Sequence, residues 1–384
     1  MPLLKANDES VRQAAAVLAR GGLVAFPTET VYGLGADAYN PAALAKIFEV
    51  KKRPCFDPLI VHIAALETLE KIADFSLLNT TARKRLFELA ENLWPGPLTI
   101  ILPKQKTIPD LATSGLPTVA VRLPENKTAR QLISLSSGAV AAPSANPFGF
   151  LSPTRAEHVQ DMLGEKIEII LDGGPSQVGV ESTVLDISGD QPRILRPGGV
   201  PKETIETFIG ATAFDLTAAS GITAPGQLKS HYAPRTPFSV YDKVSDMPNE
   251  SDSALLFFDG ASRDEWLSER NTTPLAAITA VLSETGNLLE AAANLFQTLH
   301  DLDKKGVRRI HGQFAPEGGL GVAINDRLRR AAYIDVISPK YFPRLKPELP
   351  LPIFSAKDCC PDTSADERDQ NGKSVSPPPS KMQD

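Results

Sequence analysis

The sequence predicts an α/β protein in two parts, a larger mixed layer of strands and helices followed by a smaller α/β domain. Its 384 residues suggest two domains, at about 100–200 residues each. Short apolar runs alternate with segments of helical spacing over the first two-thirds of the chain. Glycine and proline then gather between 212 and 237, which predicts a linker before the second domain.

The first domain is expected to span residues 1–211. Asn40 is a favourable N-cap, and Pro41 suits the first helical position because its missing N–H is not needed there. Thr154 is expected to cap a later helix. Helices are expected at 9–20, 41–52, 80–94 and 154–163, and strands at 23–26, 59–63, 98–102, 118–123, 139–142, 167–171 and 183–187.

The second domain is expected to span residues 238–345. The linker before it, at 212–237, is long enough to have a function of its own. Residues 346–384 are rich in Pro, Ser, Asp and Lys and predict a disordered tail. Within the domain, strands are expected at 254–258 and 308–314, and helices at 288–302 and 324–332.

Composition and motifs argue against several classes of protein. A formal net charge of -6 argues against a protein whose main task is to grip nucleic acid. The 3 cysteines and 5 histidines show no metal-ligand spacing, and no Walker A, dinucleotide-binding or nucleophile-elbow motif is present. No apolar run reaches the roughly 18 residues of a membrane span. We therefore expect a cytoplasmic protein with no metal site of its own and no membrane attachment.

Polar clusters follow several of the expected strands, where ligands bind in open α/β sheets. Pro27 to Gly35 offers hydroxyls, a carboxylate and glycines, although a turn uses the same residues. Lys51 to Arg53 could clamp a phosphate, although cations are also common at a helix C-terminus. Ala141 to Pro147, with Ser152 to Thr154 soon after, could bind an anion or simply cap helices.

Strand alternation places Thr118, Ala120 and Arg122 on one face of a strand. An arginine beside small residues suits a carboxylate ligand, although an exposed strand end would also carry one. His62 stands alone in an apolar strand, where a satisfied core histidine is the simpler interpretation. Further polar groups occur at Glu181-Ser182-Thr183, at Arg193 and Arg196, and at 227–234.

Together and in this order, these segments resemble the YrdC family. The resemblance is carried by PTETVYGLGADA, KKRP, PLIVHI, LWPGPLT, VAVRLP, AAPSAN, SPT at 152–154, ESTVLDI at 181–187 and RPG at 196–198. The region after the linker, which contains HYAP at 231–234, resembles that of the two-domain threonylcarbamoyl-AMP synthases. The resemblance implies a YrdC-like twisted mixed sheet with flanking helices, plus a smaller Rossmann-like α/β domain.

The resemblance also implies roles for individual residues. The K-x-R and S-x-N signature of the family falls here on four catalytic candidates, Lys51, Arg53, Ser144 and Asn146. Threonine would be held by Thr30, His62, Arg122, Ala142 and Ser182. ATP would be held by Arg53, Asp57, Thr118, Ser144, Ser152 and Arg196, with Tyr232 closing over it. The chain departs from the pattern at Asp57, where relatives often carry Ser or Asn, and at Gln227 and Leu228 in the linker.

The reaction that the resemblance implies joins L-threonine, bicarbonate or CO2, and ATP into L-threonylcarbamoyl-adenylate and releases pyrophosphate. Such a nucleotidyltransferase supplies threonylcarbamoyladenosine modification to tRNAs that read ANN codons. Mg²⁺ would enter with ATP, and no tightly bound cofactor is expected. The downstream partner would be the tRNA threonylcarbamoyltransferase machinery, with no stable nucleic acid required.

Two other functions remain open from the sequence. One is an RNA-binding YrdC-like module without adenylate-forming activity. The other is carbamoyl transfer to a different acceptor, as in hydrogenase-maturation relatives, which carry additional domains with zinc-type cysteine motifs that this sequence lacks.

Overall fold

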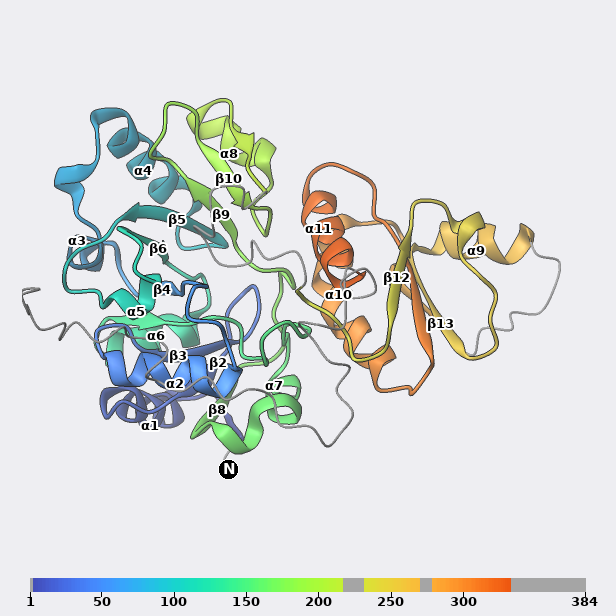
Figure 1. The fold of residues 1–384 in the computed structure, drawn as a ribbon, viewed down its shortest axis with the longest axis horizontal. Helices are drawn as coiled ribbons and strands as arrows, with labels where there is room; N and C mark the ends of the chain where they lie inside the picture. Colours follow the sequence, from blue (N-terminus) through green and yellow to red (C-terminus); the bar gives the residue numbers. More distant parts are fainter. Residues whose placement is uncertain (1–2, 217–230, 270–277, 333–384) are drawn as a thin grey trace, which may run out of the picture.

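The computed structural model describes residues 3–216, 231–269 and 278–332 and contains two β-sheets with flanking helices (Figure 1). An 11-stranded mixed sheet forms the first domain, and a 4-stranded sheet forms the second. The predicted fold class is therefore confirmed. The expected tail and the linker positions Gln227 and Leu228 lie outside the described residues.

The large sheet has the strand order β1-β8-β2-β3-β7-β4-β6-β5-β9-β10-β11. The sheet is mixed, because it contains parallel pairs such as β4 with β6 and antiparallel pairs such as β5 with β6. The strands are β1 (Leu3–Lys5), β2 (Val24–Phe26), β3 (Gly33–Asp37), β4 (Ile60–Ile63), β5 (Leu98–Pro103), β6 (Thr118–Arg122), β7 (Ala139–Ala141), β8 (Ile169–Asp172), β9 (Thr183–Asp186), β10 (Arg193–Arg196) and β11 (Ala213–Phe214).

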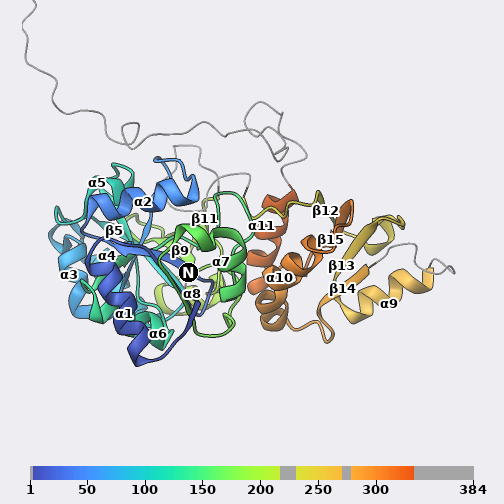
Figure 2. The same ribbon diagram turned by 90° about the horizontal axis from the view of Figure 1, so that it is seen from below.

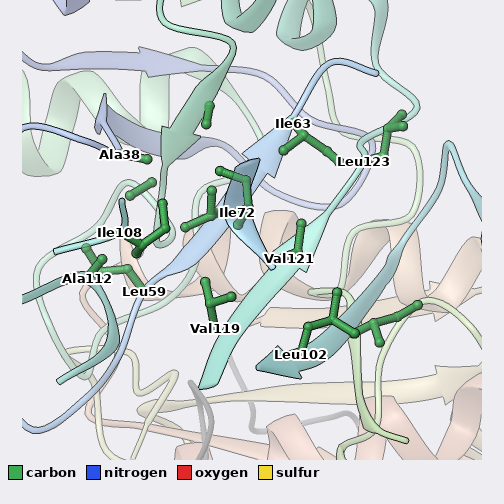
Figure 3. Close-up of a cluster of buried hydrophobic side chains, with 14 of the residues drawn as sticks. Ala38, Leu59, Ile63, Ile72, Leu102, Ile108, Ala112, Val119, Val121 and Leu123 are labelled. Carbon is green, nitrogen blue, oxygen red and sulfur yellow. The ribbon is translucent and has the colours of Figure 1, made fainter. Parts of the chain in front are cut away.

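Helices cover one face of this sheet more completely than the other. The main core contains Val61 and Val121 from the sheet and is covered by α2, α3, α4, α5, α7 and α8. Figure 3 shows Val121 and Ile72 among its buried side chains. On the opposite face, α1 and α6 pack on Phe26 and Val140. The helices of this domain are α1 (Asp8–Ala19), α2 (Pro41–Lys51), α3 (Leu69–Ile72), α4 (Thr80–Leu93), α5 (Asp110–Thr113), α6 (Lys127–Leu135), α7 (Ala156–Leu163) and α8 (Lys202–Ile209).

The expected helix start at Asn40 is confirmed, and the one at Thr154 is wrong. The side chain of Asn40 accepts hydrogen bonds from Ala42 N and Ala43 N, and Pro41 opens α2. The N-cap of α7 is instead Arg155, which makes no side-chain capping bond. The hydroxyl of Thr154 is buried without a hydrogen-bond partner among the described residues, so it caps nothing.

The segment after β2 contains a strand where two glycines suggest only a turn. β3 pairs antiparallel with β2, with Gly35 opposite Val24 and Gly33 opposite Phe26. A Cβ added at Gly35 would lie 2.8 Å from the Phe26 ring, so the strand needs glycine for close packing rather than for a turn.

The second domain is a parallel sheet with the order β12-β15-β13-β14. Its α10 and α11 lie on the side nearer the first domain (Figures 1 and 2). Its elements are β12 (Phe238–Tyr241), β13 (Ser253–Asp259), α9 (Gly260–Glu269), β14 (Ile278–Ser283), α10 (Leu288–Asp303), β15 (Arg309–Gln313) and α11 (Leu320–Ala332). Within the described parts of the chain, no helix is both long and apolar enough to cross a membrane.

The two domains share a hydrophobic core. Val31, Leu151 and Val180 of the first domain belong to the same buried cluster as the apolar residues of α10 and α11. At one point the backbones nearly touch, because a Cβ added at Gly179 would lie 2.2 Å from Ala292 O of α10. The docking of the domains is thus a packed interface with close backbone contact.

Candidate functional site

A pocket lies on the same sheet face as α1 and α6, beside the part that these two helices cover. In β4 and β6, alternation sends Val61 and Val121 into the main core and sends His62 and Arg122 to the other face. The two strands are parallel and place His62 directly beside Arg122. The predicted residues that line this one pocket are Thr30, Arg53, His62, Arg122, Ala142, Ser144, Ser182, Arg196 and Tyr232.

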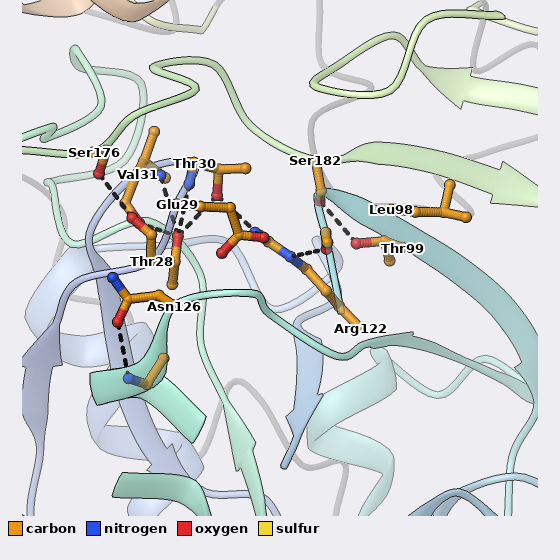
Figure 4. Close-up of polar contacts among 12 residues, drawn as sticks. Thr28, Glu29, Thr30, Val31, Leu98, Thr99, Arg122, Asn126, Ser176 and Ser182 are labelled. Carbon is orange, nitrogen blue, oxygen red and sulfur yellow. Dashed lines mark hydrogen bonds and ion pairs between the residues drawn. The ribbon is translucent and has the colours of Figure 1, made fainter. Parts of the chain in front are cut away.

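Arg122 is held in a buried network with the segment that follows β2 (Figure 4). Its Nη1 donates to Thr30 Oγ1 at 2.9 Å, and its Nη2 donates to Glu29 Oε1 at 2.5 Å. Burial alone would raise the pKa of Glu29, but the charge and hydrogen bond of Arg122 outweigh it and lower the pKa below 4.5. Glu29 Oε2 has no hydrogen-bond partner among the described residues. The network therefore fixes a guanidinium at the pocket wall.

His62 is uncharged in this setting. Burial, followed by repulsion from Arg122, lowers its pKa to about 3. Its Nδ1 lies 3.2 Å from Ile60 O, and its ring meets Phe26 edge-on with the ring centroids 6.4 Å apart. The histidine is thus both a satisfied buried group and part of the pocket lining, so the two interpretations of the sequence do not exclude each other.

Arg53 enters the pocket from the segment after α2 and is already oriented by that segment. Its Nε donates to Asp57 O at 2.9 Å, and its Nη2 donates to Pro58 O at 2.8 Å. Asp57 Oδ2 lies 2.9 Å from Arg53 Nη2 in a buried ion pair. Asp57 itself does not line the pocket, so the structure places it behind Arg53. Such an arrangement presents a guanidinium at low cost in side-chain entropy.

Lys51 and Asn146 lie behind the pocket rather than on its surface. The Lys51 ammonium donates to Ser144 O at 2.6 Å and to Asn146 O. Asn146 Nδ2 donates to Pro147 O and Phe150 O at 2.8 and 2.9 Å. Burial and repulsion from Arg53 lower the pKa of Lys51 well below 10.5. The two side chains therefore shape the segment that carries Ser144.

The far wall of the pocket is built around Glu181 and Arg196. Glu181 Oε1 accepts a 2.5 Å hydrogen bond from Ser152 Oγ, so Ser152 reaches the pocket only through Glu181. Arg196 Nη2 donates to Ser182 O at 2.9 Å and to Ser182 Oγ at 3.1 Å. Thr118 begins β6 and does not line the pocket.

Tyr232 closes the pocket from the described end of the linker. Its side chain is 1% exposed, and its φ of 66° lies in the left-handed region. His231 lines the pocket beside it and meets Phe148 edge-on, with the ring centroids 5.6 Å apart. The remainder of the predicted linker, at 217–230, falls outside the described residues.

Three residues that contact this wall or network carry no role in the sequence prediction. Glu29 belongs to the PTETVYGLGADA motif and Glu181 to the ESTVLDI motif, and each carboxylate pairs with a buried arginine. Arg327 of α11 contacts Glu181 from the second domain. Nothing in the NDRLRRAA stretch distinguishes Arg327 from its neighbours, so sequence periodicity alone could not find it.

The pocket collects cations, hydroxyls and an uncharged imidazole. Among the described residues there is no group of three or more His, Cys, Asp or Glu side chains that could hold a metal ion. Guanidinium groups at Arg53, Arg122 and Arg196 suit carboxylate and phosphate oxygens. The fold and the pocket together define a class of two-domain α/β proteins whose cationic pocket suits small anionic ligands.

Comparison with known proteins narrows this class. Residues 16–198 match a family model described as telomere recombination, and residues 200–333 match the threonylcarbamoyl-AMP synthase C-terminal domain. The threonylcarbamoyl-AMP synthase of Pyrococcus abyssi is 40% identical over 337 residues, 86% of this chain and 96% of that protein. That of Bacillus subtilis is 40% identical over 339 residues, 86% of this chain and 94% of that protein.

A solved structure agrees with the sequence relatives. The crystal structure of P. abyssi Sua5 complexed with L-threonine superposes with a TM-score of 0.74 at 37% identity, covering 86% of this chain and 98% of that chain. The chain therefore belongs to the family of two-domain threonylcarbamoyl-AMP synthases, and the resemblance stated from its motifs is confirmed.

Proposed function

We propose that this protein synthesises L-threonylcarbamoyl-adenylate from L-threonine, bicarbonate or CO2, and ATP, and releases pyrophosphate. The observation that carries the proposal is that Arg122 and Thr30 line the same pocket as the guanidinium groups of Arg53 and Arg196. The same pocket thus offers a binding site for an amino acid and a binding site for phosphates. Relatives at 40% identity over 86% of the chain carry the same activity in their names.

The amino acid seat is built on Arg122. Its guanidinium would pair with the threonine carboxylate, and the hydroxyl of Thr30 lies 2.9 Å from the same group. His62, Ala142 and Ser182 would complete this seat. Because His62 is uncharged, it can border the bound amino acid without repelling its ammonium or competing for its carboxylate.

The chemical step needs no protein nucleophile. The threonine amine takes up CO2 and loses a proton, which gives a carbamate anion. A carbamate oxygen then forms a bond to the α-phosphorus of ATP, and the bond from that phosphorus to the bridging oxygen breaks as pyrophosphate leaves. Two anions must approach each other, so Arg53 and Arg196 would neutralise phosphate charge while Ser144 orients the nucleotide.

We propose that Mg²⁺ enters with ATP as its counter-ion. Asp57 is the only carboxylate among the predicted site residues, and it is buried behind Arg53. The ion would supply further charge neutralisation on the triphosphate. Ser152 would act on the bound nucleotide through Glu181, and Thr118 would contribute from the start of β6. Tyr232 would exclude water from the labile product.

The product is a mixed anhydride that a tRNA-modifying partner must consume. We propose that the tRNA threonylcarbamoyltransferase machinery accepts it, that the protein acts in the cytoplasm, and that it needs no stable nucleic acid. The adduct would serve threonylcarbamoyladenosine formation in tRNAs that read ANN codons.

The proposal is tested by measuring pyrophosphate release with ATP, bicarbonate and threonine, and by mass spectrometry of the adenylate. Release should require threonine, and Arg122→Ala should reduce it at least about 100-fold through loss of the carboxylate partner. Threonine-independent release, or RNA binding without ATP turnover, would contradict the proposal and favour an RNA-binding module instead.

A further inference from the structure

One buried arginine of the second domain reaches across the domain boundary. Arg327 lies on α11 and is 1% exposed. Its Nε donates to Glu181 Oε2 at 2.7 Å, and its Nη1 donates to Pro197 O at 2.9 Å. Both acceptors belong to the first domain. Asp326 Oδ2 accepts from the same Nη1 at 2.7 Å, so the guanidinium also has a counter-ion on its own helix.

The contacts of Arg327 converge on the predicted ATP side of the pocket. Glu181 holds Ser152 through its other oxygen, and Pro197 directly follows Arg196. The Arg327 guanidinium carbon also lies 5.0 Å from the centroid of the Tyr232 ring. Arg327 therefore lies close to three predicted ATP contacts. It stacks on Tyr232 directly, and it reaches Ser152 through Glu181 and Arg196 through the adjacent Pro197.

The amino acid side of the pocket is held differently. Arg122 there is fixed by Glu29 and Thr30, all within the first domain. None of the hydrogen bonds of Arg327 among the described residues reaches these three side chains. Ser182, which bonds Arg196, is the point at which the two sides meet.

Charge explains why the contact matters for the nucleotide. Glu181 is 6% exposed, and a buried carboxylate needs a cation. Burial raises its pKa, and Arg327 and then Arg196 oppose that rise strongly enough to bring the pKa below 4.5. Without Arg327, the carboxylate would draw Arg196 toward itself or take up a proton and release Ser152. Either change would weaken the binding of the ATP phosphates.

We propose that Arg327 is a positioning residue through which the second domain assembles the ATP half of the pocket, by neutralising Glu181 and holding Tyr232 and the Arg196–Pro197 turn in place. The proposal rests on the proposed function, because it assigns that wall to the nucleotide. It gives the second domain a defined task in the reaction.

The test compares full-length Arg327→Met and Arg327→Lys with the wild type by isothermal titration calorimetry. The probes are a non-hydrolysable ATP analogue with Mg²⁺, and L-threonine alone. Arg327→Met should weaken analogue binding about tenfold or more and leave threonine binding within about twofold. Arg327→Lys keeps the positive charge but loses the planar guanidinium, so its affinity for the analogue should lie between those of the wild type and Arg327→Met. Arg329→Met is the matched control, because Arg329 lies on the same helix but is exposed and pairs with Glu317 in the preceding loop.

A second variant separates positioning from general damage. Adding Glu181→Gln to Arg327→Met removes the uncompensated charge and should recover part of the analogue affinity. If Arg327→Met fails to fold, the same comparison is made with Arg327→Lys. Unchanged analogue binding, or equal losses for analogue and threonine, would overturn the inference. Failure of the wild type to bind the analogue would instead overturn the proposed function.

Discussion

Lys51 shows how a charged residue can support a site without lining it. Its ammonium is 1% exposed and holds the carbonyl oxygens of Ser144 and Asn146. The sequence suggested a phosphate clamp for the whole Lys51 to Arg53 stretch. The structure separates the members, because Arg53 lines the pocket and Lys51 lies behind the segment that carries Ser144. The catalytic role of Lys51 thus stays a prediction, and its position favours an indirect one.

We expect Lys51→Met to lower the free energy of unfolding by about 1–3 kcal/mol, because two buried carbonyls lose a donor. Pyrophosphate release should fall as well, since Ser144 is no longer held. Urea unfolding and the release assay measure the two effects. Lys52→Met, at the exposed neighbouring position, is the control. Lost ATP-analogue binding at unchanged stability would show that Lys51 contacts phosphate directly.

At this scale, the sequence could predict which polar residues meet but not how each one is held. Strand ends are a local rule that pointed to the segments of Thr30 and Ser144, and strand alternation pointed to Arg122, whereas His62 was assigned to the site only through the family resemblance; all four line one pocket. The partners of these residues come from distant segments. Arg327 lies 146 residues from Glu181 in the chain, so no local pattern could pair them.

Among the elements, the turn that follows β10 depends on glycine for space. A Cβ added at Gly198 would lie 2.3 Å from Glu181 O and 2.4 Å from Thr183 N. The turn therefore packs directly on the backbone that leads into β9. This contact keeps Arg196 beside Ser182 and explains in physical terms the glycine of the RPG segment.

Gly198→Ala should destabilise the protein by about 1–3 kcal/mol and raise the KM for ATP, because the turn must move away from β9. Gly164→Ala is a suitable comparison, since its Cβ would meet only Gln160 Cγ at 3.5 Å. Thermal unfolding and steady-state kinetics measure the two effects. Equal behaviour of the two variants would show that the close packing at Gly198 is unimportant.

Elements with a clear hydrophobic periodicity or an N-cap residue could be predicted from the sequence. Strands that form only through packing or pairing with distant segments could not. The helix from Pro41 was found through its cap, within one residue of its end. β3 was missed because its glycines are typical of turns, whereas tertiary packing on Phe26 makes it a strand. β1 is 3 residues long and exists only through its pairing with β8.

For the whole molecule, length and the proline-rich linker predicted two domains, but not how they dock. The interface contains His158 of α7 and His300 of α10, whose rings stack with centroids 3.9 Å apart. Thr154 N donates to His158 Nδ1, and His300 Nε2 lies 3.1 Å from Ser152 O. Lys304 and Asp161 form an ion pair beside them. Such contacts arise only once both domains are folded.

This histidine pair predicts that the protein is weakened by mild acid. Burial, and then His300, lowers the pKa of His158 to about 3, and burial also lowers the pKa of His300. Both pKa values are lower in the folded state than the unfolded value of 6.5, so the unfolded chain binds protons first. Stability is therefore full above about pH 6.5 and is lost as the pH falls toward about 3.

For His158 alone, the loss between about pH 6.5 and about pH 5 should be at most about 1.5 kcal/mol. The free energy of unfolding, measured in urea across this range, checks the slope. Buried His62 contributes a slope of its own, so the informative comparison is with His158→Phe. That variant should show a shallower pH dependence, and an unchanged slope would contradict the assignment.

The absence of a side chain at Gly179 has a consequence for building hybrids of this family. Only hydrogen atoms separate this residue from the α10 backbone at Ala292 and Ala293. We expect the first domain of this protein to accept the second domain of a relative only where that domain again presents a small-residue stretch of helix to Gly179. Compatibility of exchanged domains should therefore be judged first at this close backbone contact, and only afterwards from overall sequence identity.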